Sequence, residues 1–206
     1  MNKRNYSNEM NSIIASFNGA TPSLLLHACC APCSSACLER LAFTFKITVF
    51  YYNPNITSKE EYQKRVLEEQ RFINEFNDKH KGQPDFNTIG FIEGKYEPDK
   101  FYDISRGLED CPEGGERCHR CYALRLDASA SLAVEMHFDY FTTTLTISPL
   151  KNADKLNEIG EQLSRKHNAC FLPSDFKKKD GYKRSIELSK EYNLYRQNYC
   201  GCEFSK

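Results

Sequence analysis

Apolar, β-branched runs alternate with amphipathic segments along most of the chain, and this alternation limits the folds open to it. Runs typical of strands lie at 23–28 (SLLLHA), 46–52 (KITVFYY), 87–92, 139–147 and 169–173. Segments with helical spacing of apolar residues lie at 34–43, 58–80, 121–137, 152–168 and 181–193. Repeated strand–helix order predicts an α/β protein, with a parallel sheet covered by helices on both faces.

Cysteines and polar residues follow the predicted strands. Cys29 and Cys30 come after the first strand, Asn53 after the second, Ser148 after the fourth and Asp175 after the fifth. The carboxyl ends of parallel strands meet at one edge of a sheet, and α/β proteins bind their ligands outside that edge. We therefore expect a Rossmann-like (HUP-like) domain with its active site at the C-terminal edge of the strands.

The 206 residues, of which 40% are hydrophobic, suit one domain with a core of its own. We expect residues 1–20 to be a flexible N-terminal arm and residues 21–206 to be a single catalytic domain that includes the Cys-rich C-terminal tail. No apolar run reaches the roughly 18 residues of a membrane span. The apolar stretches near the N-terminus are too broken for a secretory signal. These features predict a cytoplasmic protein without a membrane partner.

Ten cysteines are the most unusual feature of the composition. In a reducing compartment, clustered cysteines indicate metal binding or redox catalysis rather than disulfides. Cys118 and Cys121 are three residues apart where a helix begins, and a helix N-terminus favours thiolates. Gly201 allows Cys200 and Cys202 to face one centre, or each other. Cys29, Cys30 and Cys33 form a third group. Of the remaining cysteines, Cys37 and Cys170 are expected in the core, and the position of Cys111 is ambiguous.

Three interpretations of the thiols follow from the pattern alone. Soft thiolate ligands select zinc or iron–sulfur clusters. A structural zinc ion takes four ligands, which leaves three of the grouped cysteines over. An iron–sulfur cluster also takes four cysteines, and the surplus pair then serves as a redox partner. The sequence CAPC directly after a strand is also typical of a thioredoxin-like dithiol. The iron–sulfur cluster is the preferred interpretation.

Six segments, taken in order, resemble the iron–sulfur epoxyqueuosine reductases of the QueH type: HACCAPCSS, FYYNPNI, EYQKR, GGERCHRCYALRL, TTTLTISPLKN and YRQNYCGCEF. The resemblance extends from about residue 23 to residue 204. It implies a cytoplasmic oxidoreductase that completes queuosine biosynthesis. The implied substrate is epoxyqueuosine at the wobble position of the tRNAs for Tyr, His, Asn and Asp. An electron donor that the sequence does not identify is a further implied partner.

The same resemblance implies roles for particular cysteines. It gives the ligands of a [4Fe–4S] cluster as Cys29, Cys30, Cys118 and Cys121, and a redox-active pair as Cys200 and Cys202. Some members of the family have Asp where this chain has Cys33. Because Asp and Cys both bind iron, Cys33 is a candidate ligand for a second iron ion next to the cluster.

The implied reaction fits this inventory. Conversion of an epoxide to an alkene takes up two electrons and two protons, and the oxygen leaves as water. A cluster passes one electron at a time, whereas a dithiol stores two. A Lewis-acidic iron would polarise the epoxide oxygen. His27, Asp110 and Asp175 are candidate proton donors.

Charge is balanced over the whole chain, with 28 basic and 28 acidic residues, so net charge predicts no partner. The bases are nevertheless concentrated within residues 177–184, as Lys177, Lys178, Lys179, Lys183 and Arg184. Such a segment is either a solvated surface or a contact for the phosphates of tRNA.

Other functions are testable alternatives. A nucleotide-dependent tRNA-modifying or sulfur-transfer enzyme should have a glycine-rich phosphate loop after the first strand. The corresponding residues here, HACCAPCSS, contain no glycine. A non-catalytic zinc-binding RNA module would be colourless and contain stoichiometric zinc. A thioredoxin-like enzyme would reduce disulfides with Cys30 and Cys33 and without any metal.

Overall fold

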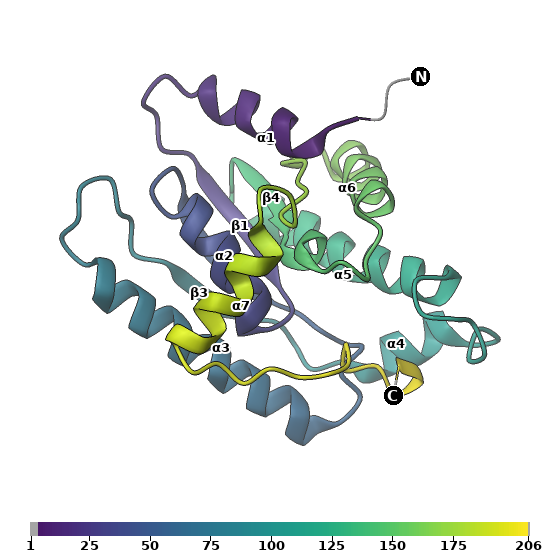
Figure 1. The fold of residues 1–206 in the computed structure, drawn as a ribbon. Helices are drawn as coiled ribbons and strands as arrows, with labels where there is room; N and C mark the ends of the chain where they lie inside the picture. Colours follow the sequence, from purple (N-terminus) through teal and green to yellow (C-terminus); the bar gives the residue numbers. More distant parts are fainter. Residues whose placement is uncertain (1–3, 206) are drawn as a thin grey trace.

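A four-stranded sheet, parallel throughout, lies between two layers of helices (Figure 1). This computed structural model describes residues 4–205. In chain order its elements are α1 (Tyr6–Ala15), β1 (Ser23–Ala28), α2 (Ala31–Leu41), β2 (Lys46–Tyr51), α3 (Lys59–His80), β3 (Gly90–Glu93), α4 (Pro98–Ser105), α5 (Glu116–Glu135), β4 (Tyr140–Thr143), η1 (Thr144–Ile147), α6 (Ala153–His167), α7 (Gly181–Glu191) and η2 (Glu203–Ser205).

The strand order explains why the chain forms a crevice at one place on the sheet. The order is β3-β2-β1-β4, so the chain moves outward from β1 through β2 to β3 and then returns to the other side of β1. In sheets of this kind ligands bind where the order reverses, outside the carboxyl ends of the strands. Here that point lies between β1 and β4, next to Cys29. The predicted α/β fold with a parallel sheet flanked by helices is confirmed.

Side chains of β1 alternate between two hydrophobic cores. Leu24 and Leu26 face a core that also contains residues of α1, α2, α3 and α7. Leu25 faces the other core, which α5 and α6 complete. This period of two follows from strand geometry, and because both faces are buried, the strand reads in the sequence as an uninterrupted apolar run.

The last two predicted strands are much shorter in the structure, whereas those at 46–52 and 87–92 differ by a few residues at their ends. The predicted strand 139–147 ends at Thr143, whose side chain accepts a hydrogen bond from the Leu145 backbone and starts the 3₁₀ helix η1. The predicted fifth strand, 169–173, is a single parallel bridge between Phe141 and Phe171. Pairing does not extend past this bridge: residue 173 is Pro173, which has no N–H to donate, and the Ser174 backbone donates to the Asn157 side chain of α6.

The N-terminal segment forms a helix where the sequence analysis expects a flexible arm. Asn5 caps α1, and Met10 of α1 is completely buried in the core that α2 and α3 share. Residues 1–3 of the predicted arm lie outside the described residues. The mobility of residues 1–20 and the division at residue 21 remain predictions. None of the helices in residues 4–205 combines the length and apolar character needed to cross a membrane, and the cytoplasmic location also stays a prediction.

Candidate active site

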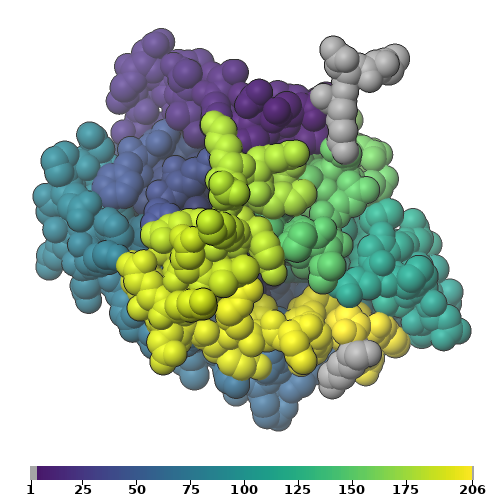
Figure 2. All heavy atoms as spheres, in the orientation of Figure 1, coloured from purple at the N-terminus to yellow at the C-terminus, as the bar shows by residue number. Residues whose placement is uncertain are grey.

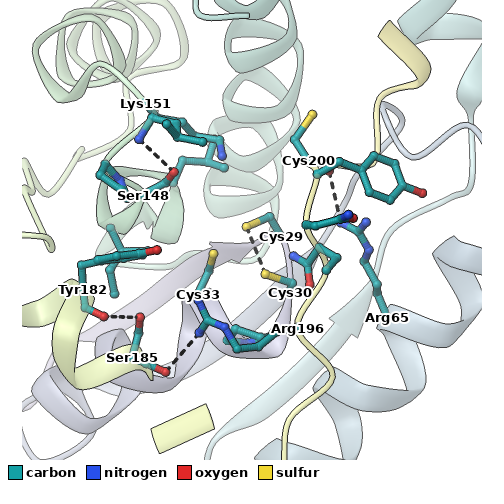
Figure 3. Close-up of a pocket in the computed structure, with 18 of the residues that line it drawn as sticks. Cys29, Cys30, Cys33, Arg65, Ser148, Lys151, Tyr182, Ser185, Arg196 and Cys200 are labelled. Carbon is teal, nitrogen blue, oxygen red and sulfur yellow. Dashed lines mark hydrogen bonds between the residues drawn. The ribbon is translucent and has the colours of Figure 1, made fainter. Parts of the chain in front are cut away.

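A cavity of about 370 Å³ opens at the C-terminal edge of β1 and β4 (Figure 3). Its walls come from the start of α2, the loop after η1, α7 and the C-terminal tail. A smaller cavity of about 20 Å³ adjoins it on the side of α4 and α5. Cys200, Arg125, Lys151 and Glu113 line both cavities, so the two form one site.

The first cysteine group forms the floor of the larger cavity. Cys29 follows β1, and Cys30 is the extended N-cap residue of α2. Pro32, in the first turn of α2, favours a helix start at this point. Cys33 lies in the same turn, and the sulfur atoms of Cys29, Cys30 and Cys33 are within 4.8 Å of one another. The Sγ atoms of Cys29 and Cys30 are 3.8 Å apart.

These thiols form a local site for negative charge. Hydrogen bonds from Cys30 and Cys33 lower the pKa of Cys29 well below its usual value, and Lys151 and Arg125 add to this effect. The Cys29 thiolate in turn raises the pKa of Cys30 to about 12 and that of Cys33 well above its usual value. The three sulfurs therefore titrate as one coupled group in which Cys29 carries the negative charge.

The second cysteine group begins helix α5. Gly115 is the N-cap residue, and the predicted spacing places Cys118 and Cys121 in the first two turns. The Sγ atom of Cys118 accepts a hydrogen bond of 3.2 Å from the Gly114 backbone. Burial raises the pKa of Cys121 to about 11. Both sulfurs line the smaller cavity, together with Cys200 and Cys202.

The C-terminal tail brings the third group to the site by running along α3 (Figure 1). The Tyr195 backbone donates to Glu68, and the Tyr195 hydroxyl donates to Glu61. The ammonium group of Lys64 lies over the Tyr195 ring, 3.4 Å from its centre. Three residues of one helix face therefore hold a segment that has no regular secondary structure of its own.

Cys200 itself is fixed through its carbonyl oxygen. Arg65 Nη1 donates to this oxygen at 3.1 Å, and Asn55 Nδ2 donates at 3.3 Å. Gly201 has a φ of +104°, and a Cβ atom here would lie 2.7 Å from Ile56. Only glycine fits both the left-handed backbone and the close approach, which explains the spacer between Cys200 and Cys202.

The pKa values of the two tail cysteines are shifted in opposite directions. Cys202, with Ser205 and Lys151, lowers the pKa of Cys200 to about 5. The Sγ atom of Cys200 lies 3.1 Å from the Ser205 hydroxyl. The Cys200 thiolate raises the pKa of Cys202 well above its usual value. At neutral pH the pair is therefore one thiolate and one thiol.

His27, a predicted candidate proton donor, lies in a buried network beneath the site. Its Nδ1 atom pairs with the Thr143 hydroxyl at 2.9 Å, and Arg125 donates to Nε2 at 3.3 Å. Burial and the Arg125 charge lower the pKa of His27 to about 3. Neutral His27 and the Asn53 side chain, which accepts from Arg125 as well, together hold the guanidinium in place. The role of His27 as a proton donor is not supported.

The two predicted acids lie away from the cavities. Asp110 is exposed, and Asp175 pairs with Lys177 at 2.9 Å; neither lines either cavity. The acid that lines both is Glu113. The sequence analysis did not identify it as a site residue, nor the four cations that line the larger cavity: Arg65, Arg125, Lys151 and Arg196. Spacing offered one signal, because Arg125 lies four residues after Cys121 and thus on the same helix face.

The other cysteines take no part in lining the site. Cys37 is fully buried in the core, as predicted. The prediction that Cys170 is buried was wrong: its side chain is exposed, while that of the next residue, Phe171, is buried. Cys111 is half-buried near Gly115, where an added Cβ would meet its sulfur at 2.6 Å.

Behind α2, the carboxyl group of Glu69 is completely buried. One of its oxygens accepts a hydrogen bond from the Ser34 hydroxyl, and the other has no partner among the described residues. Burial raises the pKa of Glu69 to about 8, and the charge of Cys29 adds to the effect. Glu69 is therefore mostly protonated at neutral pH, which keeps a second negative charge away from the cysteine group.

Glu69→Gln should change how stability depends on pH. In the unfolded chain a Glu loses its proton near pH 4.3, but in the fold it does so near pH 8. Between these values the folded state holds the extra proton, so the free energy of unfolding of the wild type falls as pH rises. Glutamine keeps the shape and does not titrate. At pH 9 we expect the variant to be more stable by up to a few kcal/mol, since one pKa unit is about 1.4 kcal/mol.

Chemical denaturation under anaerobic conditions from pH 5 to pH 9 measures this difference. Glu75→Gln, a change to an exposed carboxylate of the same helix, is the matched control and should leave the pH slope unchanged. The same slope in Glu69→Gln as in the wild type would show that Glu69 is ionised in the fold.

Comparison with known proteins shows which family the chain resembles. The family model described as epoxyqueuosine reductase QueH matches residues 24–206. An epoxyqueuosine reductase QueH of Streptococcus pyogenes serotype M1 is 47% identical over 184 residues, which cover 89% of this chain and 70% of the relative. The same-named protein of Staphylococcus epidermidis is 43% identical over 207 residues, covering 98% and 85%. The epoxyqueuosine reductase QueH of Thermotoga maritima is 33% identical over 189 residues, which cover 89% of this chain and 90% of the relative.

Proposed function

Because the chain belongs to the epoxyqueuosine reductase QueH family, we propose that its cysteines hold a [4Fe–4S] cluster and supply electrons that remove the epoxide oxygen of epoxyqueuosine in tRNA. As a member of this family the chain is an oxidoreductase of queuosine biosynthesis that acts on tRNA. The observation that carries the proposed mechanism is the meeting of three cysteine groups around two joined cavities.

The donor set suits iron. All the grouped side chains are thiolates or thiols, and soft thiolates select iron–sulfur centres or zinc. The proposed cluster ligands are Cys29, Cys30, Cys118 and Cys121. The sulfur of Cys33 lies within 4.8 Å of those of Cys29 and Cys30, which supports a further role for Cys33 as ligand to a second, single iron. The centre, when bound, provides one-electron transfer and Lewis acidity.

Cys200 and Cys202 supply the two-electron chemistry. Oxidation of the dithiol to a disulfide releases two electrons and two protons, and reduction of the epoxide to the alkene consumes both, with the oxygen leaving as water. The reaction therefore balances without another reductant in one turnover. A Cys-x-Cys disulfide is a small, strained ring, which an external electron donor would readily reduce again.

Residues of this chain also hold the protons and charges that the reaction needs. Cys202 keeps its proton at neutral pH beside the Cys200 thiolate, and is therefore the proposed source of one proton. Burial opposes the charge of Lys151, but Cys29, Cys33 and Cys200 outweigh this and raise its pKa. Lys151 lines both cavities and is the proposed donor of the second proton. The Arg125 guanidinium stabilises the negative charge of the thiolates around it.

The basic segment is the proposed contact for the tRNA backbone, with a narrower set of residues than the sequence predicted. Lys177 pairs with Asp175, and Arg184 pairs with Glu39 and Glu187. The bases that remain exposed are Lys178, Lys179 and Lys183. The acceptor tRNAs for Tyr, His, Asn and Asp are part of the same proposal.

Replacement of Lys178, Lys179 and Lys183 with Ala should weaken tRNA binding and flatten its dependence on salt. Each lost phosphate contact lowers the slope of log K against log [salt] by about 0.7–0.9. Fluorescence anisotropy at several salt concentrations measures both effects. The matched control replaces three exposed lysines near the opposite edge of the sheet: Lys46, Lys81 and Lys166. An unchanged affinity and slope in the first triple variant would make the segment a solvated surface only.

Anaerobic purification followed by metal analysis and spectroscopy tests the cofactor. We expect a coloured, iron-containing protein whose electron paramagnetic resonance spectrum changes on reduction with dithionite. The same preparation should convert epoxyqueuosine to queuosine in a tRNA anticodon stem-loop. A colourless protein with stoichiometric zinc and no conversion would favour the non-catalytic RNA-binding alternative.

A further inference from the structure

The larger cavity is sized for one nucleoside and not for an RNA loop. Its volume of about 370 Å³ lies near the lower end of the range for small-molecule sites, about 300–1,000 Å³. Enzymes that act on one base of a folded nucleic acid extrude that base into such a pocket. A single-stranded base of this kind is usually held by stacking on an aromatic side chain.

Two large apolar side chains stand exposed where this cavity opens to solvent. Tyr182 of α7 is 39% exposed and Leu150 of the loop after η1 is 71% exposed, and both line the cavity. Exposed apolar residues occur singly on any protein surface, but two at one cavity mouth provide apolar area that a bound ligand would cover. In the space-filling view, α7 and the C-terminal tail gather on this one face (Figure 2).

Of the two aromatic residues that line the cavity, only Tyr182 has a ring available for stacking. Tyr199 is the other, and the Arg65 guanidinium lies over its ring at 5.3 Å. Within residues 4–205, no aromatic ring or cation stacks on Tyr182. Its side chain lies on the opposite side of Cys29 and Cys33 from Cys200 (Figure 3).

The backbone before Tyr182 is held in a tight turn. Lys179 and Asp180 both have positive φ values, 53° and 61°. A Cβ atom on Gly181 would lie 1.8 Å from the Phe176 carbonyl oxygen, so only glycine fits. Helix α7 then packs along α2, the helix that carries Cys33. The ring is therefore placed in advance relative to the cysteines, which reduces the entropy lost when a ligand binds.

We propose that Tyr182 is the stacking platform for the modified base of epoxyqueuosine after extrusion from the anticodon loop. The inference rests on the proposed function and names the part of the site that receives the base. Stacked on Tyr182, the base directs its epoxide-bearing substituent toward the cysteine floor. The exposed Lys178 and Lys179 precede the platform by a few residues and are positioned for the flanking phosphates.

The test uses an anticodon stem-loop with 2-aminopurine at the wobble position, a base whose fluorescence is quenched by stacking. The wild-type protein and Tyr182→Phe, which keeps the ring, should both quench the probe. Tyr182→Ala should quench little and bind roughly ten- to hundred-fold more weakly, the range for loss of one base–aromatic stack. Phe43→Ala is the matched control, since Phe43 is also 39% exposed but lines neither cavity; it should behave as wild type. Iron content should be the same in all four proteins.

Conversion of an epoxyqueuosine stem-loop by the wild type is measured alongside. If the wild type converts it and Tyr182→Ala binds and quenches as the wild type does, the stacking platform is overturned and the proposed function stands. If the wild type converts nothing, the proposed function fails and the platform with it. A loss of binding in Tyr182→Phe equal to that in Tyr182→Ala would also overturn stacking, because the ring is still present in that variant.

Discussion

Replacing Cys200 or Cys202 with Ser is expected to stop epoxyqueuosine reduction while the protein keeps its iron. Either change removes the dithiol that stores two electrons, and it also removes either the thiolate or its protonated partner. Conversion should fall by at least roughly 10²-fold, the lower limit for the loss of a positioned proton-transfer group. The measurements are queuosine formed per minute and iron bound per protein, both under anaerobic conditions.

Cys170→Ser is the control for this experiment, because Cys170 is exposed and lines neither cavity. It should retain both iron and activity. Loss of iron in Cys200→Ser to the extent seen in a cluster-ligand variant would mean that the tail pair ligates the metal. Full activity in Cys202→Ser would contradict the redox role instead.

Cys118→Ser and Cys121→Ser are expected to lose most of the iron and the visible colour. Each proposed ligand supplies one of the four thiolates that a cluster needs, and metal binding is coupled to folding, so stability should fall as well. Because Cys121 is buried at the start of α5 and packs with Cys202 and Phe101, the effect on melting temperature should be larger for Cys121→Ser than for the half-buried Cys118→Ser.

The corresponding variants of Cys29 and Cys30 should behave in the same way. Cys33→Ser tests the second iron: partial loss of iron with the cluster spectrum retained is the expected result. Retention of the full iron content in Cys29→Ser would count against the proposed ligand set. Cys37→Ser, in the core behind the site, should leave the iron content unchanged.

Much of the fold is predictable because its signals are local. The segment 58–80, with helical spacing of its apolar residues, forms α3, and Ser58 caps this helix by accepting a hydrogen bond from the Glu61 backbone. The fifth strand is different. Residues 169–173 pair with β4 only at Phe141, and the backbone just beyond them binds the Asn157 side chain, a contact between segments that are not neighbours in the sequence.

The candidate site likewise has a part that the sequence predicts and a part that it does not. Cysteine spacing and the order of strands together predict that three thiol groups gather at one edge, and they line the two joined cavities there. The cations around them could not be predicted, because Arg65 and Lys151 resemble ordinary surface bases until α3 and the loop after η1 are folded beside the tail. For His27 the apolar run around it does predict burial, but Arg125, which together with that burial lowers the pKa of His27 and leaves the imidazole neutral, is 98 residues away in the sequence.

A single-turnover reaction tests the central claim most directly. The protein is reduced, freed of external reductant under anaerobic conditions, and mixed with an excess of tRNA that carries epoxyqueuosine; queuosine and remaining thiols are then counted. The account predicts close to one equivalent of queuosine per protein and loss of a pair of titratable thiols, which mass spectrometry should locate as a disulfide between Cys200 and Cys202. Queuosine formed with every thiol still titratable, or no queuosine from an iron-loaded protein, would contradict it.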